Sequence, residues 1–67
     1  PVRDVLTVDT KNTIDNISIY NMMGQQVLSQ NPYAASAKVT VSALQAGIYL
    51  VRVSAAGKLS TNRIIKN

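Results

Sequence analysis

Residues 44–53 constrain the fold of this chain most, because a turn closed by Gly47 runs directly into an alternating strand. Tyr49, Val51 and Val53 share one face of this predicted strand, since side chains alternate along an extended backbone. A tyrosine near the start of a sandwich strand commonly hydrogen-bonds back to backbone a few residues upstream, the arrangement called a tyrosine corner. Residues 44–53 therefore predict an all-β fold, and they indicate no reaction.

Alternation and β-branched residues also dominate the rest of the chain, and no segment keeps apolar residues at helical spacing for three turns. We predict strands over residues 5–8, 14–20, 25–29, 38–41, 48–54 and 58–65. A polar turn over 10–13, a hairpin turn over 21–24 and a poorly ordered loop over 30–36 separate the earlier strands. The prediction is one domain over residues 1–67, a small antiparallel immunoglobulin-like sandwich of six to seven strands.

Composition excludes most kinds of chemical site. The chain has no cysteine and no histidine, so disulfides, soft-ligand metal sites and the familiar catalytic triads cannot be assembled. Its only carboxylates are Asp4, Asp9 and Asp15, which fall at predicted strand ends or turns, where aspartate is common for local hydrogen bonding. Asp9 and Asp15 with backbone oxygens are a weak option for calcium. We therefore expect no catalytic residue, no cofactor and no metal.

The charge pattern argues against nucleic acid as a partner. The net charge is +4, but the basic residues are scattered along the chain: Arg3, Lys11, Lys38, Arg52, Lys58, Arg63 and Lys66. Phosphate binding requires basic residues clustered on one face. No apolar stretch approaches the ~20 residues of a membrane-spanning helix, so we expect no membrane insertion. Because the chain begins at Pro1, we expect it to be a fragment of a longer protein.

The strand that follows the corner is apolar on both faces. Ile48 and Leu50 point away from the corner tyrosine, and Val5, Tyr20 and Ile64 are candidates to share their face. One interpretation is that the 30–36 loop or an edge strand covers this face. The other is an exposed patch that docks onto a partner.

Met22 and Met23 stand at the tip of the predicted hairpin turn, where polar residues are usual. Either one of the two side chains packs into the end of the core, or the pair forms an adaptable contact surface. Gly24 and Gly47 are isolated glycines at predicted turns, so they do not form a glycine-rich phosphate-binding loop.

Taken in order, four segments resemble the type A C-terminal sorting domain of the type IX (Por) secretion system of Bacteroidetes. They are residues 1–8, which open on a proline, the hairpin 17–27, the corner 44–53 and the basic-apolar end 63–67. The positions that carry the structural motif of the family are Gly24, Leu44, Gly47 and Tyr49. Two departures exist: the asparagine usually found before the opening proline is absent, and Arg63 stands where lysine is common.

The resemblance implies a non-catalytic secretion signal. Such a domain ends a cargo protein, is recognised by the outer-membrane translocon, and directs the cargo through the periplasm to the cell surface or medium. A sortase-like cysteine peptidase of the system then removes it, by a cut upstream of the domain. The N-terminal cargo domain of the same chain, the translocon and this peptidase are thus the implied partners.

For the recognition surface we predict six residues on the last two strands, in which cations accompany apolar side chains: Ile48, Leu50, Lys58, Arg63, Ile64 and Lys66. Deletion of residues 63–67 should then leave cargo in the periplasm. The alternative is a small immunoglobulin-like or fibronectin-like adhesive module that binds glycan or protein. An uncovered edge strand would also permit a weak homodimer.

Overall fold

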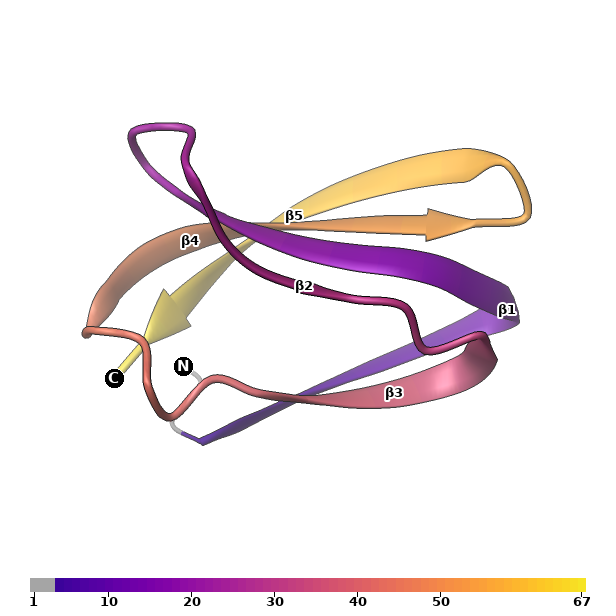
Figure 1. Ribbon diagram of the computed structural model, residues 1–67, viewed down its shortest axis with the longest axis horizontal. Helices are drawn as coiled ribbons and strands as arrows, with labels where there is room; N and C mark the ends of the chain where they lie inside the picture. The colour runs from indigo at the N-terminus through magenta and orange to yellow at the C-terminus, as the bar shows by residue number, and fades with distance from the viewer. Residues whose placement is uncertain (1–3) are drawn as a thin grey trace.

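In the computed structural model, which describes residues 4–67, five β-strands pair antiparallel (Figure 1). They are β1 (Val5–Asn21), β2 (Gln26–Gln30), β3 (Ala34–Thr40), β4 (Gly47–Ala55) and β5 (Lys58–Lys66). Pro1, the opening proline of the family motif, lies outside the described residues. Within residues 4–67 no helix has the length and apolarity needed to cross a membrane.

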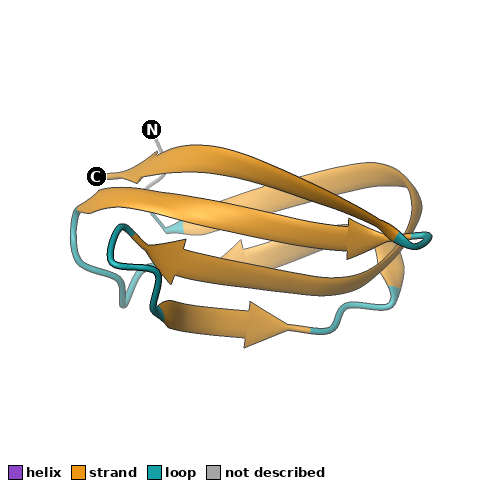
Figure 2. Ribbon diagram, turned by 90° about the horizontal axis from the view of Figure 1, so that it is seen from above, coloured by secondary structure: helices purple, strands orange, loops and turns teal. Residues whose placement is uncertain are grey.

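β1 belongs to both layers of the molecule because it bends in the middle. Its second part, residues 14–21, pairs with β2 on one side and β4 on the other, giving the strand order β2-β1-β4-β5. Its first part, residues 5–9, pairs with β3, and the register shifts between Asp9 and Ile14. Figure 2 shows the four-strand layer in front of β3 and the start of β1. One open sheet is thus folded over on itself, with β1 common to both layers.

The predicted turn over residues 10–13 is wrong, since this stretch lies inside β1. Lys11, Asn12 and Thr13 are exposed, and the backbone of exposed polar residues can be hydrated in an extended strand as well as in a turn. The Thr10 hydroxyl donates to the carbonyl oxygen of Asn12, and the amide of Tyr33 donates to the carbonyl oxygen of Ile14 at 2.9 Å. The two predicted N-terminal strands are therefore one.

Residues 4–67 thus contain five strands in one open sheet, in place of the predicted immunoglobulin-like sandwich of six to seven strands. The predicted loop over 30–36 also proves too long. Ala34 and Ser36 already belong to β3, because they pair with Ile14 and Asp9 of β1. Pairing with β1 satisfies backbone groups of a stretch whose small residues carry little strand signal.

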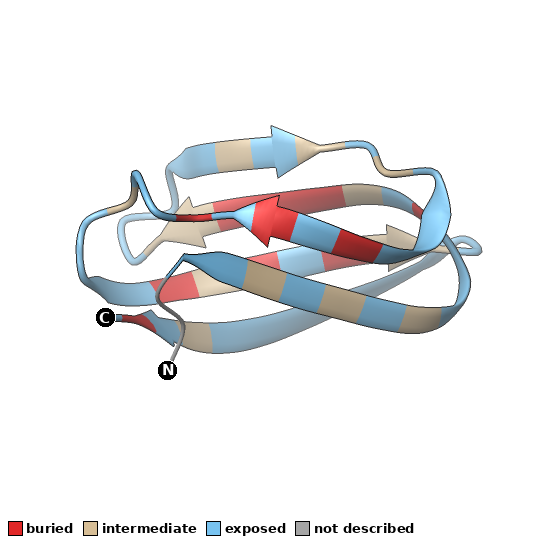
Figure 3. Cartoon of the chain, turned by 90° about the horizontal axis from the view of Figure 1, so that it is seen from below, coloured by how far each residue is buried: buried red, intermediate tan, exposed pale blue. Residues whose placement is uncertain are grey.

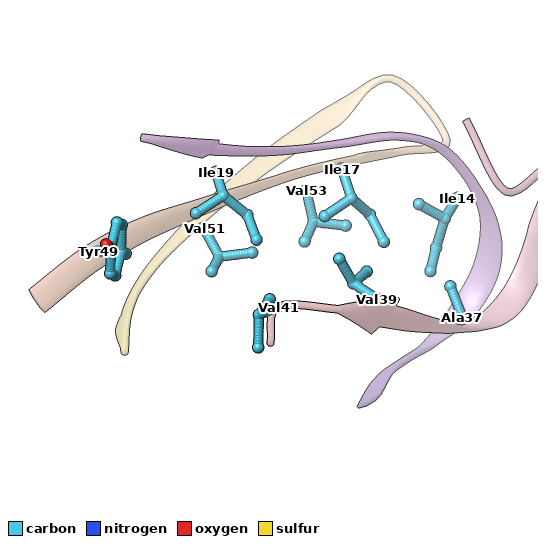
Figure 4. Packing of buried hydrophobic residues seen from close by; sticks show 9 residues of the cluster. All are labelled: Ile14, Ile17, Ile19, Ala37, Val39, Val41, Tyr49, Val51 and Val53. Carbon is cyan, nitrogen blue, oxygen red and sulfur yellow. The ribbon is translucent and has the colours of Figure 1, made fainter. Parts of the chain in front are cut away.

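The core lies between the two layers. Its buried apolar residues are Ile14, Ile17, Ile19, Ala37, Val39, Val41, Tyr49, Val51 and Val53. Figure 4 shows the side chains of β3 and its C-terminal flank facing those of β1 and β4 across the core. The predicted inward positions on the second part of β1 and on residues 39–41 are confirmed. Along β3 this appears as the alternation of buried and exposed positions in Figure 3.

Candidate functional site

The β4–β5 hairpin has a register fixed by its two-residue turn. Ala56 and Gly57 both have positive φ, +52° and +76°, and Ala55 pairs directly with Lys58. Two consecutive positive φ angles are the mark of a type I′ turn, whose twist matches that of the flanking strands. Every later pair of the hairpin follows from this turn. Among them are Ile48 with Ile65 and Leu50 with Arg63.

These two pairs form what we call the outer patch: Ile48, Leu50, Arg63 and Ile65. Opposed residues of an antiparallel pair share one face of the sheet, and Tyr49 points to the other face, into the core. Ile48 is 42% exposed and Ile65 52%. The interpretation that a loop or edge strand covers this face fails, because both isoleucines remain open to solvent.

Cations border the outer patch. One of these cations is Arg63, which belongs to the patch. The other is Arg52, whose guanidinium carbon lies 5.4 Å from the centroid of the Tyr20 ring, within the range of a cation–π contact. Tyr20 lies on the next strand, opposite Leu50 of the patch. All the carboxylates of the chain precede Asn16, so β4 and β5 carry none. The patch is therefore apolar at its centre and positive at its border.

The six residues predicted for the recognition surface divide between the two faces. Ile48, Leu50 and Arg63 come together on the outer patch. Ile64 lies opposite Tyr49 and packs against the core, so it is not on the face where the sequence placed it. Lys66, opposite Gly47, is only 8% exposed, and its Nζ donates to the carbonyl oxygen of Asn67 at 2.8 Å.

Lys58, the sixth predicted residue, is exposed but lines a hollow on the inner side of the hairpin. Ile65 was missed, although the sequence held a signal for it. Counting pairs outward from a two-residue turn at Ala56 and Gly57 leads to the opposition of Ile48 and Ile65. Alanine is not favoured at positive φ, so Ala56 gave only a weak indication of a two-residue turn. The register could therefore not be counted from the sequence.

Among residues 4–67, no three metal-binding side chains gather into a group, so the weak calcium option at Asp9 and Asp15 gains no third carboxylate.

Comparison with known proteins gives a family. The family model described as secretion system C-terminal sorting domain matches residues 1–67, the whole chain. The chain belongs to this family. It is the sorting domain of the Por (type IX) secretion system, a non-catalytic signal domain of a secreted protein. Neither a search of curated proteins nor one of solved structures found a match.

The hairpin motif of the sorting domain has a structural explanation in Asn21. Its side-chain oxygen accepts hydrogen bonds from the amides of Met23 and Gln25, both at 3.0 Å, and its side-chain nitrogen donates to the Gln25 side chain at 3.0 Å. Gly24 closes the turn with a φ of +84°, in the left-handed region that favours glycine. Asparagine, glycine and glutamine at this spacing thus build one rigid turn.

The two methionines between Asn21 and Gly24 contribute nothing to the core. Met22 is 62% exposed and Met23 82%, so the expectation that one of them is buried is wrong. The rigid turn holds both side chains out into solvent. Of the two interpretations, only the adaptable contact surface stays compatible with the structure.

The corner motif of the sorting domain is confirmed. The Tyr49 hydroxyl donates to backbone upstream in the chain, at the carbonyl oxygen of Gln45. Leu44 packs against the core, and its amide donates to the carbonyl oxygen of Val41 at 3.0 Å. Residues 41–46 therefore connect β3 of one layer to β4 of the other, and hydrogen bonds hold both ends of this connection.

Proposed function

We propose that the outer-membrane translocon of the type IX system recognises this sorting domain through the outer patch. The domain would end a longer cargo protein and direct it through the periplasm to the cell surface or the medium. The domain contributes shape and surface to this process, and the translocon supplies the transport.

The exposure of Ile48 and Ile65 is the observation that carries the proposal. Ile48 and Ile65 are directly opposed on β4 and β5, so their exposed side chains lie side by side on one face of the sheet. Two neighbouring isoleucines left in solvent, beside Leu50 and Arg63, have the composition of an interface centre with a charged border. Such a surface supports binding to a protein partner.

We also propose that the sortase-like cysteine peptidase of the system cuts the chain N-terminal to β1. Proteolysis needs an extended, accessible segment, whereas residues 5–9 and 14–21 of β1 pair with β2, β3 and β4. A cut within either paired part of β1 would require a layer of the fold to open. The cargo would thus be released with the sorting domain intact.

The test is a paired substitution on the outer patch. A reporter protein carrying this domain at its C-terminus would be produced in a bacterium with a Por system, with Ile48→Ser and Ile65→Ser combined. We expect the reporter to accumulate in the periplasm. The matched control is Leu59→Ser, because Leu59 is an exposed apolar residue on the same face of β5, opposite Ser54.

Export of the double variant at the wild-type level would refute the proposal. Urea unfolding of each purified domain establishes that the variants are folded. Substitution is a sharper test than deletion of residues 63–67, because that segment includes Ile64, which packs on the core, and Lys66, which is buried. Such a deletion would remove part of the fold together with the surface.

A further inference from the structure

Two exposed arginines lie next to each other on the outer face of the β4–β5 hairpin. Arg63 of β5 lies opposite Leu50 of β4, and Arg52, two residues after Leu50, lies opposite Thr61. Arg52 and Arg63 are therefore diagonal neighbours on the face of the outer patch, at a separation that long side chains can span. Leu50 adjoins both of them and is itself half-buried.

The residues directly opposite these two arginines are uncharged. Arg52 has Ser18 of β1 on one side and Thr61 of β5 on the other. Arg63 has only Leu50, because β5 pairs with β4 alone among the described strands. Two like charges on one face repel each other, and an anion placed between them from outside the domain would remove this repulsion.

The carboxylates of the chain belong to other parts of the fold. Asp9 pairs with β3 in the other layer, and the backbone of Asp4 bonds to the chain that follows β3. Asp15 precedes Asn16, which pairs with Ser54 near the far end of β4. None of the three therefore lies opposite a residue of the outer patch.

Tyr20 holds one of the two guanidinium groups in place. The guanidinium carbon of Arg52 lies 5.4 Å from the centroid of the Tyr20 ring. A cation–π contact engages the charge of the guanidinium and does not consume its N–H donors, whose planar arrangement matches the two oxygens of a carboxylate. Less side-chain freedom is then lost when Arg52 binds an anion, which favours binding.

Charge and composition decide between the possible occupants of this face. A second copy docked through the same patch would bring two more arginines and no carboxylate into the contact. An anionic membrane surface attracts clusters of about four to eight Lys or Arg, and segments that lie on it commonly insert Trp or Phe. The patch has two arginines, and the chain has neither of these aromatic residues. A partner protein with a carboxylate beside apolar side chains fits both the arginines and the isoleucines.

We propose that the translocon presents an acidic side chain to the outer patch and that its carboxylate binds between Arg52 and Arg63. Apolar side chains of the same partner surface would cover Ile48 and Ile65. The inference rests on the proposed function, because it names the chemistry of the partner at the same patch. It adds that charge, together with apolar contact, selects this partner.

Charge reversal at two positions of β5 tests the inference in the exported reporter. Arg63→Glu places a like charge against the partner carboxylate, so export should fall at least about tenfold. Lys58→Glu makes the same change in net charge, but Lys58 lines the hollow on the other side of the hairpin, so export should stay within about twofold of the wild type. Arg63→Lys keeps the charge and should stay within about threefold. Urea unfolding of each purified domain establishes that the three variants are folded.

A zero-length crosslink tests for the carboxylate directly. A water-soluble carbodiimide joins an amine to a carboxylate in contact with it through an amide bond. The purified Arg63→Lys reporter would be treated with it on outer membranes from a bacterium with a Por system, and the products mapped by mass spectrometry. We expect an amide between the introduced amine and an Asp or Glu of a translocon protein, with the yield at Lys58 at least about fivefold lower.

Four results would overturn the inference. Export of Arg63→Glu at the wild-type level is the first, and an equal loss with Lys58→Glu is the second, since net charge alone would then explain the defect. The third is a crosslink to the translocon at Lys58 and none at the introduced amine. The fourth is binding of the purified domain to phosphatidylglycerol vesicles that Arg63→Glu abolishes and Lys58→Glu retains, which would assign the anion to lipid.

The failure of this inference can be distinguished from the failure of the proposed function. If the double variant with Ile48→Ser and Ile65→Ser is retained in the periplasm while Arg63→Glu is exported, the outer patch remains the recognition surface and the carboxylate is excluded. If the double variant and Arg63→Glu are both exported normally, both proposals fail.

Discussion

The hydroxyl of Tyr49 donates a hydrogen bond of 2.7 Å to the carbonyl oxygen of Gln45, four residues upstream. The tyrosine ring lies in the core, only 8% exposed, while Gln45 stands in the exposed turn that precedes β4. One side chain thus joins the connection between the layers to the core beneath it. The turn and the first residues of β4 are held in one conformation by this contact.

Removal of this hydroxyl should destabilise the domain. Tyr49→Phe keeps the ring in the core and deletes only the hydrogen bond, so we expect the free energy of unfolding to fall by about 1–2 kcal/mol. Urea denaturation at constant pH measures this change in the free energy of unfolding. Tyr33→Phe is the control, because Tyr33 is largely exposed, and its stability should stay within about 0.5 kcal/mol of the wild type. Equal losses for both variants would contradict a special role for the corner.

The hairpin turn should depend on Asn21 more than on the methionines beside it. Asn21→Ala removes the acceptor for two backbone amides and the contact with Gln25, so we expect a loss of about 1–2 kcal/mol. Met23→Ala, in the same turn but outside the core, should leave the free energy of unfolding nearly unchanged. Thermal unfolding followed by circular dichroism distinguishes the two. A larger effect at Met23 would show that the methionine packs in solution.

The β4–β5 turn carries strain that substitution can relieve. Ala56 has a φ of +52°, where a Cβ atom is disfavoured, and asparagine tolerates this conformation better. Ala56→Asn should therefore stabilise the domain by about 0.5–1 kcal/mol.

Gly57→Ala is the reciprocal variant of the same turn. It should cost about 1 kcal/mol through backbone strain alone, because no atom lies within 4 Å of the added Cβ. Both values come from the midpoint of urea unfolding. If both variants shifted stability in the same direction, the turn would not be type I′ in solution.

Val39 joins the two layers, and its truncation should be costly. It is fully buried on β3 and faces the side chains of β1 and β4 (Figure 4). Val39→Ala removes two methyl groups and leaves a cavity, so we expect a loss of about 2–3 kcal/mol. Val27→Ala on β2 is the matched control, because Val27 is exposed and should lose less than about 1 kcal/mol. Similar losses at the two positions would show that β3 does not pack across the core.

Local pattern was enough to predict the strand character of the chain, the inward residues and the corner. Alternation placed Ile17, Ile19, Val51 and Val53 in the core, because a pleated strand presents successive side chains to opposite faces. The family motif identified the sorting domain for the same reason, since Asn21, Gly24 and Tyr49 act through contacts within a few residues. Interactions between residues close together in the chain can therefore be predicted directly from the sequence.

Long-range pairing decided what the sequence could not. Whether residues 10–13 turn or continue as strand depends on β3 lying beside β1, and polar residues suit either outcome. The same holds for the face of Ile64, which a one-residue change of register would reverse. Composition and periodicity determined the all-β class, the buried tyrosine and the lack of catalytic groups. Only the tertiary structure determined the bend in β1 and the opposition of Ile48 and Ile65, because each arises between segments distant in the chain.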